Sequence, residues 1–321
     1  MRLPEDLAEA MEREFEKVQH PALAQAVSQL TARYQGEDFS GPIVVSAALR
    51  AAYLAVRLPA TYAAAARVLA EMKRYIPEEE VGSVLDLGSG PGTVLHAAAW
   101  NFSSLRQMTA VESDTALIEL GRRLASQSFH ECVQKAAWLC RDLKSGAVKG
   151  RHDLVVMSYV LGELPAAMAE KALAGAWEAA GEFLVLIEPG TRRGFGAIHA
   201  ARSALIGAGA HVLAPCPHTR DCPMAAANDW CHFPVRVERT SLHRRLKGGV
   251  LGYEDEKFSY LIATRRGIAP APARIVRHPQ KHSGHIRLTL CTPEGIEQRT
   301  VTKSQKEQYK AARKADWGEE F

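Results

Sequence analysis

The chain lacks any uninterrupted run of about eighteen apolar residues, the length that a membrane-spanning helix needs. Its first residues, MRLPEDLAEAMEREFEKV, also lack the basic start and the apolar run of a signal peptide. We therefore expect no membrane contact, and a location in the cytoplasm or, with its targeting segment absent, in an organelle.

Cysteine is scarce, with six residues in a chain of 321, yet half of them lie in CPHTRDCPMAAANDWC at 216–231. In a reducing compartment, clustered cysteines are more often metal ligands or redox groups than disulfides. Cys216, Cys222 and Cys231 have C-x5-C-x8-C spacing and lack the C-x2-C pair that structural zinc ribbons favour. We expect them to bind a metal; three unliganded thiols are the alternative.

Positive charge is sparse at one end of the chain and abundant at the other. Residues 1–80 have 9 Lys and Arg against 12 Asp and Glu, whereas residues 232–321 have 18 against 10. The basic end is the one that would meet a polyanion such as RNA. A solvated basic surface without a partner is the alternative.

The apolar pattern changes near residue 80. Residues 1–80 are rich in Ala, Leu, Arg and Glu, with apolar residues three and four positions apart, which predicts helices. Beyond them, short apolar runs (SVLDLG, QMTAVE, DLVVMS, FLVLIEP and FSYLIATR) alternate with helical segments, which predicts a parallel, doubly wound α/β sheet. We predict an N-terminal helical cap at 1–80, a core at 81–266 with an insertion at about 205–250, and a small basic β-element with a tail at 267–321.

The segment VLDLGSGPGT at 84–93 brings an apolar strand to a turn that contains Gly88, Gly90 and Gly92. Glycine lets the backbone approach a ligand closely, and the next helix would present its N-terminal amides there. Such a turn also suits a dinucleotide site or a plain strand–helix connection. Its G-x-G-x-G spacing, however, lacks the G-x-G-x-x-G of the dinucleotide fingerprint.

Two acids extend this pattern, since Asp86 precedes the turn and Glu112 ends the next strand, where it would accept both ribose hydroxyls. In these features the chain resembles class I S-adenosylmethionine-dependent methyltransferases. The resemblance implies a Rossmann-like fold and binding of S-adenosylmethionine, or of its demethylated product, by Asp86, Gly88, Ser89, Gly90, Gly92, Glu112 and, near the adenine, Asp142. A surface acid at Glu112 and a turn cap at Asp142 are the alternatives.

No catalytic residue is predicted. The segment after the fourth strand, MSYVLGEL at 157–164, lacks the Asn-Pro-Pro-Tyr or Asp-Pro-Pro-Tyr pattern of methyltransferases that act on base amino groups, although Ser158 and Tyr159 could line a pocket. Transfer to a good nucleophile needs little beyond in-line placement of the methyl group, so the missing motif does not exclude activity.

A fourth metal ligand is needed beside the three clustered cysteines. Cys291, at the end of the predicted strand HIRLTLC, would tie the C-terminal β-element to the insertion; His218 and His232 are the alternatives. Cys132 and Cys140 fall in a helix and a strand of the core, where buried, inert cysteine is the common outcome. Ligand softness alone does not separate an iron–sulfur cluster from zinc.

The combination C-P-H…C-P…W-C-H-F with R-H-P…C resembles, over most of residues 40–300, the mitochondrial small-ribosomal-subunit assembly family of methyltransferase-like proteins (Rsm22-type) and its bacterial relatives. The resemblance implies a four-iron four-sulfur cluster, with zinc as the alternative, on Cys216, Cys222, Cys231 and Cys291. It also implies the small ribosomal subunit and its rRNA as partners.

Two functions are then expected: S-adenosylmethionine-dependent methylation of rRNA, or assembly of the subunit by a catalytically inactive RNA-binding factor. Methylation of a small molecule or protein is weaker, because the C-terminal third is basic. The candidate phosphate contacts are Arg244, Arg245, Lys247, Arg265 and Arg266.

Overall fold

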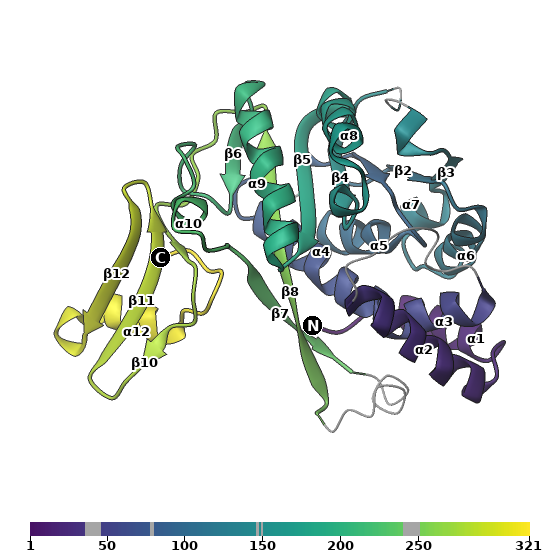
Figure 1. Cartoon of the computed structure of the whole chain (residues 1–321), viewed down its shortest axis with the longest axis horizontal. Coiled ribbons are helices and arrows are strands. Elements are labelled where there is room, and N and C mark those ends of the chain that lie inside the picture. The colour runs from purple at the N-terminus through teal and green to yellow at the C-terminus, as the bar shows by residue number, and fades with distance from the viewer. Residues whose placement is uncertain (36–45, 78–79, 146–147, 149, 240–250) are drawn as a thin grey trace. The chain divides into compact units, whose positions relative to one another are not determined.

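The computed structural model describes residues 1–35, 46–77, 80–145, 148, 150–239 and 251–321 (Figure 1). Its chain divides into two compact units. The first unit consists of Met1–Ala70, Glu78–Ala147 and Val235–Glu256, and the second of Glu71–Pro77, Val148–Pro234 and Lys257–Phe321. Each unit joins segments that lie apart in the sequence, and the division predicted at residues 80 and 266 stays a prediction. No helix of the described residues is long and apolar enough to cross a membrane.

The helices predicted for residues 1–80 are present. They are α1 (Glu5–Phe15), α2 (His20–Gln35), α3 (Ala47–Val56) and α4 (Leu58–Met72). The side chain of Ser46 caps α3 by accepting a hydrogen bond from the amide of Leu49. Pro59 lies in the first turn of α4, where its missing N–H breaks no helical hydrogen bond, so the two helices are separated just before it.

Three parallel strands form the sheet of the first unit, in the order β3 (Ala137–Cys140), β2 (Gln107–Glu112), β1 (Ser83–Leu87). α5 (Thr93–Asn101) links β1 to β2, while α6 (Thr115–Ala125) and the short α7 (Glu131–Gln134) link β2 to β3. Because parallel strands end at the same edge of a sheet, the glycine turn after β1 lies beside Glu112 at the end of β2.

The second unit contains a mixed sheet. β4 (His152–Ser158) and β5 (Ala180–Pro189) are parallel and are joined through η3 (Leu161–Glu163) and α8 (Ala166–Ala179). β8 (Tyr253–Thr264) pairs antiparallel with both β5 and β6 (His211–Ala214), and α9 (Arg192–Gly207) connects β5 to β6. The predicted Rossmann-like α/β fold is confirmed. The all-parallel sheet was wrong, because β8 follows the insertion and β7 (Phe233–Glu238), with no crossover helix in the described part of that connection.

The C-terminal β-element is a four-stranded antiparallel sheet. β11 (His285–Thr292) pairs with β12 (Gly295–Thr302) on one side and with β9 (Arg274–Ile275) and β10 (Gln280–Lys281) on the other. The predicted turn at 293–295 joins β11 to β12. After η4 (Lys303–Gln305), the helix α12 (Lys306–Lys314) contributes Tyr309 to a core that includes Leu288 and Leu290.

Candidate functional site

The glycine turn adopts the backbone conformation that its sequence predicts. Gly88, Gly90 and Gly92 have φ angles of 74°, 52° and 82°, in the left-handed region that other residues enter only with strain. The amides of Gly88 and Ser89 donate to the carbonyl oxygen of Val111, at 2.8 and 3.0 Å. The turn is thereby fixed to the neighbouring strand, and α5 begins directly after it.

Glu112 holds the glycine turn. Its Oε2 accepts a hydrogen bond from the amide of Gly90 at 2.9 Å, while its Oε1 accepts from the amides of Ser113 (2.7 Å) and Asp114 (2.9 Å) and more weakly from the Ser113 hydroxyl (3.3 Å). A carboxylate offers about four acceptor positions. The sequence predicted that Glu112 accepts both ribose hydroxyls; here four protein donors already engage it, so that prediction requires some of them to be exchanged.

Asp86 is a buried carboxyl group, 1% exposed, at the end of β1. Neither of its oxygens has a hydrogen-bond partner among the described residues. Burial, with a smaller contribution from the negative charge of Glu112, raises the pKa of Asp86 to about 8. A cation beside Asp86 would satisfy these oxygens, and S-adenosylmethionine carries a sulfonium and an amino group, so this residue fits that cofactor.

Asp142 has the role that the sequence offered as its alternative. Its Oδ1 accepts a hydrogen bond from the amide of Lys144 at 2.8 Å, at the start of η2 (Leu143–Ser145), and the residue is exposed. A contact with adenine at Asp142 stays a prediction.

The segment after β4 is held by an acid that the sequence analysis missed. Tyr159 has a φ of 60°, and its amide donates to the carbonyl of Ile187 at 2.7 Å. Glu188, 1% exposed at the end of β5, accepts hydrogen bonds from three consecutive amides, and burial raises its pKa to about 7. The three donors are Val160, Leu161 and Gly162. The only sequence signal was an acid that ends an apolar strand.

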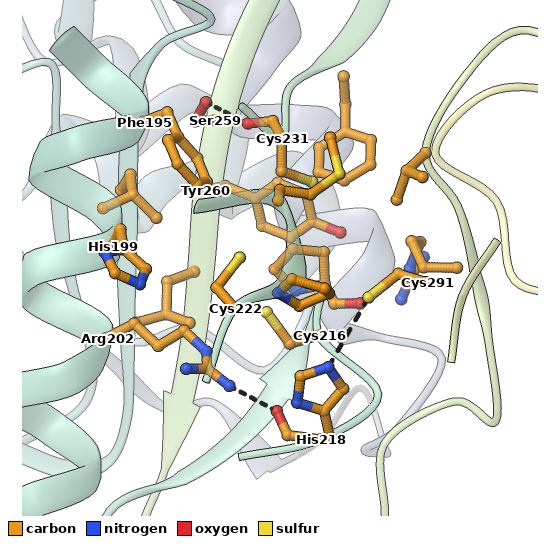
Figure 2. A pocket seen from close by; sticks show the side chains of 18 residues that line it. Phe195, His199, Arg202, Cys216, His218, Cys222, Cys231, Ser259, Tyr260 and Cys291 are labelled. Carbon is orange, nitrogen blue, oxygen red and sulfur yellow. Dashed lines mark hydrogen bonds between the residues drawn. The ribbon is translucent and has the colours of Figure 1, made fainter. Parts of the chain in front are cut away.

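Four cysteines from separate segments of the second unit line one pocket (Figure 2). Cys216 follows β6, Cys222 precedes α10 (Pro223–Ala226), Cys231 precedes β7, and Cys291 lies on β11. The pocket is lined mainly by apolar atoms, with Phe195 and Tyr260 on its wall. The structure thus brings together the four residues that the sequence proposed as ligands.

Burial disfavours the charged form of these thiols. It raises the pKa of Cys216, raises that of Cys231 well above its usual value, and raises that of Cys291 to about 12. Repulsion from the neighbouring cysteines acts in the same direction. Four thiolates could share this pocket only with a multivalent cation among them, which is the chemistry of a metal ion or an iron–sulfur cluster.

The two histidines that are alternatives to Cys291 as the fourth ligand lie in different places. His218 also lines the pocket, with its Nε2 3.8 Å from the Sγ of Cys291. His232 is 8% exposed; it stacks on Trp230, with ring centroids 5.4 Å apart, and meets Trp317 edge-on, with ring centroids 4.8 Å apart. His218 is therefore the better placed of the two histidines.

Two further cysteines lie in the first unit, and the expectation of buried, inert thiols was wrong for one of them. Cys140 is exposed, because it ends the edge strand β3, whereas Cys132 in α7 is half-buried. In the described part of the chain, no group of three or more His, Cys, Asp or Glu is arranged as around a single metal ion.

The predicted phosphate contacts are only partly described. Arg244, Arg245 and Lys247 lie outside the described residues. Arg265 donates to the carbonyl oxygens of Ala180 (2.9 Å) and Trp177 (2.6 Å), and Arg266 pairs with Glu182 at 2.7 Å. These two arginines brace the end of α8, and their contact with phosphate stays a prediction.

The sequence of this chain is similar to a known protein family and to individual proteins. The family model described as mitochondrial small ribosomal subunit Rsm22 matches residues 47–321. The human ribosome assembly protein METTL17, mitochondrial, is 30% identical over an alignment of 287 positions that covers 83% of this chain and 61% of that protein. The Schizosaccharomyces pombe Rsm22-cox11 tandem protein 2, mitochondrial, is 26% identical over an alignment of 329 positions that covers 84% of this chain and 42% of that protein. The chain spans less than two thirds of the length of either relative.

Solved structures are similar to this chain at low identity. Magnesium protoporphyrin IX methyltransferase from Synechocystis with bound S-adenosylmethionine is 13% identical, with a TM-score of 0.44 over 74% of this chain and 91% of that chain. A methyltransferase from Leishmania major is 11% identical, with a TM-score of 0.42 over 76% and 82%. Because the family model covers more than half of the sequence, the chain belongs to the Rsm22 family of mitochondrial small ribosomal subunit proteins.

Proposed function

We propose that this protein binds S-adenosylmethionine at the glycine turn, carries a four-iron four-sulfur cluster on Cys216, Cys222, Cys231 and Cys291, and acts on the small ribosomal subunit and its rRNA. The observation that carries the proposal is the convergence of these four cysteines on one pocket in a member of the Rsm22 family. The names of the relatives, which refer to mitochondria and ribosome assembly, support the partner and a location in the mitochondrial matrix, or in the cytoplasm of a bacterium.

The first unit supports cofactor binding through two features. The left-handed glycines leave the turn backbone without side chains of its own at three positions. Asp86 has a buried carboxyl group without a hydrogen-bond partner among the described residues. S-adenosylmethionine supplies an electrophilic methyl group. The residues of the chain would orient it: the turn amides at the methionine part, and Glu112 at the ribose after exchange of the Ser113 hydroxyl, its weakest donor.

Zinc and a cluster place different demands on the four thiolates. Tetrahedral zinc needs every sulfur about 2.3 Å from one centre. In a four-iron cluster each thiolate binds a different iron, so the sulfurs surround a larger volume. We propose the cluster, with a single zinc ion on the same thiols as the alternative, and metal analysis separates the two.

A second function, assembly without methyl transfer, is favoured by a specific observation. Glu112 is fully engaged by protein donors, and Glu188 ties the segment after β4 to β5 through three amides. Ser158, at the end of β4, has a buried hydroxyl that lacks a hydrogen-bond partner within the described residues. None of these contacts therefore positions a general base for methyl transfer.

Transfer of a tritiated methyl group from S-adenosylmethionine to immature small subunits separates the two functions. The comparison uses wild type, Gly90→Arg, and Gly196→Arg as a control on the exposed side of α9, where nothing lies within 4 Å of an added Cβ. Transfer by wild type and the control but not by Gly90→Arg would establish methylation. Tight subunit binding without transfer would establish the assembly role, and neither binding nor transfer would contradict both.

A further inference from the structure

Arg202 is a buried cation that forms no ion pair with a carboxylate of the described residues. It lies on α9 and is 4% exposed. Its Nη2 donates to the carbonyl oxygens of His218 at 2.7 Å and Arg220 at 2.8 Å, both in the loop that carries Cys216 and Cys222. Its Nε is buried and has no hydrogen-bond partner in the described structure.

Two other arginines near the cysteines are neutralised. Arg274 pairs with Glu71 at 2.6 Å, and Arg277 pairs closely with Asp229. No described carboxylate forms an ion pair with Arg202, whose Nη2 binds carbonyl oxygens. A buried charge is unfavourable unless an opposite charge and hydrogen bonds compensate it. Arg202 therefore requires an anion that the carboxylates of the structure do not provide.

The thiols are the groups in a position to be that anion. Arg202 lines the pocket together with all four cysteines (Figure 2). A positive charge in the wall of a pocket favours the ionised form of the thiols that share it.

We propose that Arg202 is the positioning and charge-compensating residue of the cysteine site. Its Nη2 holds the loop at His218 and Arg220, and its charge stabilises the anionic metal site. This inference rests on the proposed metal site. A guanidinium has no lone pair to offer a metal, so Arg202 acts through the sulfurs.

The net charge of the cluster shows that Arg202 would change its reduction potential. Four thiolates carry a charge of −4 and an oxidised four-iron core carries +2, which gives −2; one-electron reduction gives −3. A nearby positive charge stabilises the more anionic, reduced state. Loss of that charge should therefore make the reduction potential more negative, an effect that bracing of the loop alone would not produce.

The test compares full-length wild type, Arg202→Gln, Arg202→Lys and Arg220→Gln, all purified anaerobically. Arg220 is the matched control, because it lies in the same loop with an exposed side chain whose charge is screened by water. Electron paramagnetic resonance during a redox titration measures the potential. We expect the reduction potential of Arg202→Gln to be about 59 mV more negative than that of wild type, which corresponds to a change of about tenfold in the equilibrium constant for one-electron reduction. The potential of Arg220→Gln should match wild type.

Arg202→Lys keeps the test decisive if the glutamine variant does not fold. Lysine retains the charge, so the potential should match wild type at neutral pH and fall as rising pH deprotonates the buried lysine, whereas wild type stays flat. A wild-type potential in Arg202→Gln, or a flat pH profile in Arg202→Lys, would overturn the inference.

The metal of the wild type separates this inference from the proposed function. If wild type contains zinc and no iron, the cluster proposal fails, and the rate of zinc removal by a chelator becomes the readout. Faster removal from Arg202→Gln than from Arg220→Gln would support the role of Arg202, and equal rates would contradict it. Wild type that binds neither metal would overturn both proposals.

Discussion

The amide of Gly90 donates a hydrogen bond to Oε2 of Glu112 at 2.9 Å, so the acid at the end of β2 fixes the central glycine of the turn after β1. Glu112→Ala removes the acceptor of this and two further amides. We expect S-adenosylmethionine affinity to fall about tenfold to a hundredfold, because each hydrogen bond to a charged group contributes about 1.5–3 kcal/mol. Calorimetry measures this. Glu119→Ala, an exposed acid on α6, is the control, and unchanged affinity in Glu112→Ala would mean that the cofactor binds elsewhere.

The raised pKa of Asp86 predicts that cofactor binding is coupled to the release of a proton. With a pKa of about 8, its carboxyl group is protonated at pH 7 in the ligand-free protein. A bound cation lowers this pKa, so binding at pH 7 should release about one proton, and affinity should rise between about pH 6 and 8. Calorimetry in buffers of different ionisation enthalpy counts the proton. Asp86→Asn should release none; release equal to wild type would exclude Asp86 as the source.

Gly92→Ala tests the strain and the packing of the turn. Gly92 has a φ of 82°, and a Cβ there would lie 2.8 Å from a ring carbon of Trp138. The left-handed conformation alone is unfavourable for alanine by about 1–2 kcal/mol, so the free energy of unfolding should fall by at least that amount. Denaturant unfolding measures it. Gly196→Ala in α9 is the control and should increase stability by up to about 1 kcal/mol; equal effects would refute the argument.

Arg274 and Glu71 form a buried ion pair at 2.6 Å, with side chains 1% and 2% exposed. Arg274 also donates to the carbonyl oxygens of Pro215 and Gly318, so it joins β9 to the segment before Cys216 and to the C-terminus. Arg274→Met should reduce stability by about 3–5 kcal/mol, because Glu71 then stays buried and keeps, of its two arginine partners, the more distant Arg74 at 3.6 Å. Thermal unfolding is the measurement. Lys310→Met, in an exposed pair with Glu307, should change stability by less than about 1 kcal/mol.

Local pattern predicted much of the fold. The strands around β1, β2, β4, β5 and β8 are apolar runs, and the break between α3 and α4 follows from Pro59. The reversed direction of β8 was not readable, because strand direction depends on the connection and not on the strand. Short β3 and β6 have four residues each, too few for a periodic signal.

The candidate site was predictable where one residue type carries the chemistry. Cysteine spacing and strand position pointed to Cys291, about sixty residues from Cys231, although spacing alone does not show that two distant segments meet. Arg202 and Glu188 had no such signal, since an arginine on a helix and an acid at a strand end are common. Their importance appears only from burial and from the partners that they have or lack.

Metal and sulfide analysis of anaerobically purified protein tests the central claim, that four cysteines from distant segments hold one cluster. We expect brown wild-type protein with absorption near roughly 400 nm, and about four irons and four sulfides per chain. Cys291→Ser should be bleached and should show faster hydrogen exchange around residues 211–239 and 274–302, because the cluster joins these segments, whereas Cys132→Ser should match wild type. Colourless wild type with one zinc per chain would contradict the cluster, and full metal retention in Cys291→Ser would exclude Cys291 as a ligand and favour His218.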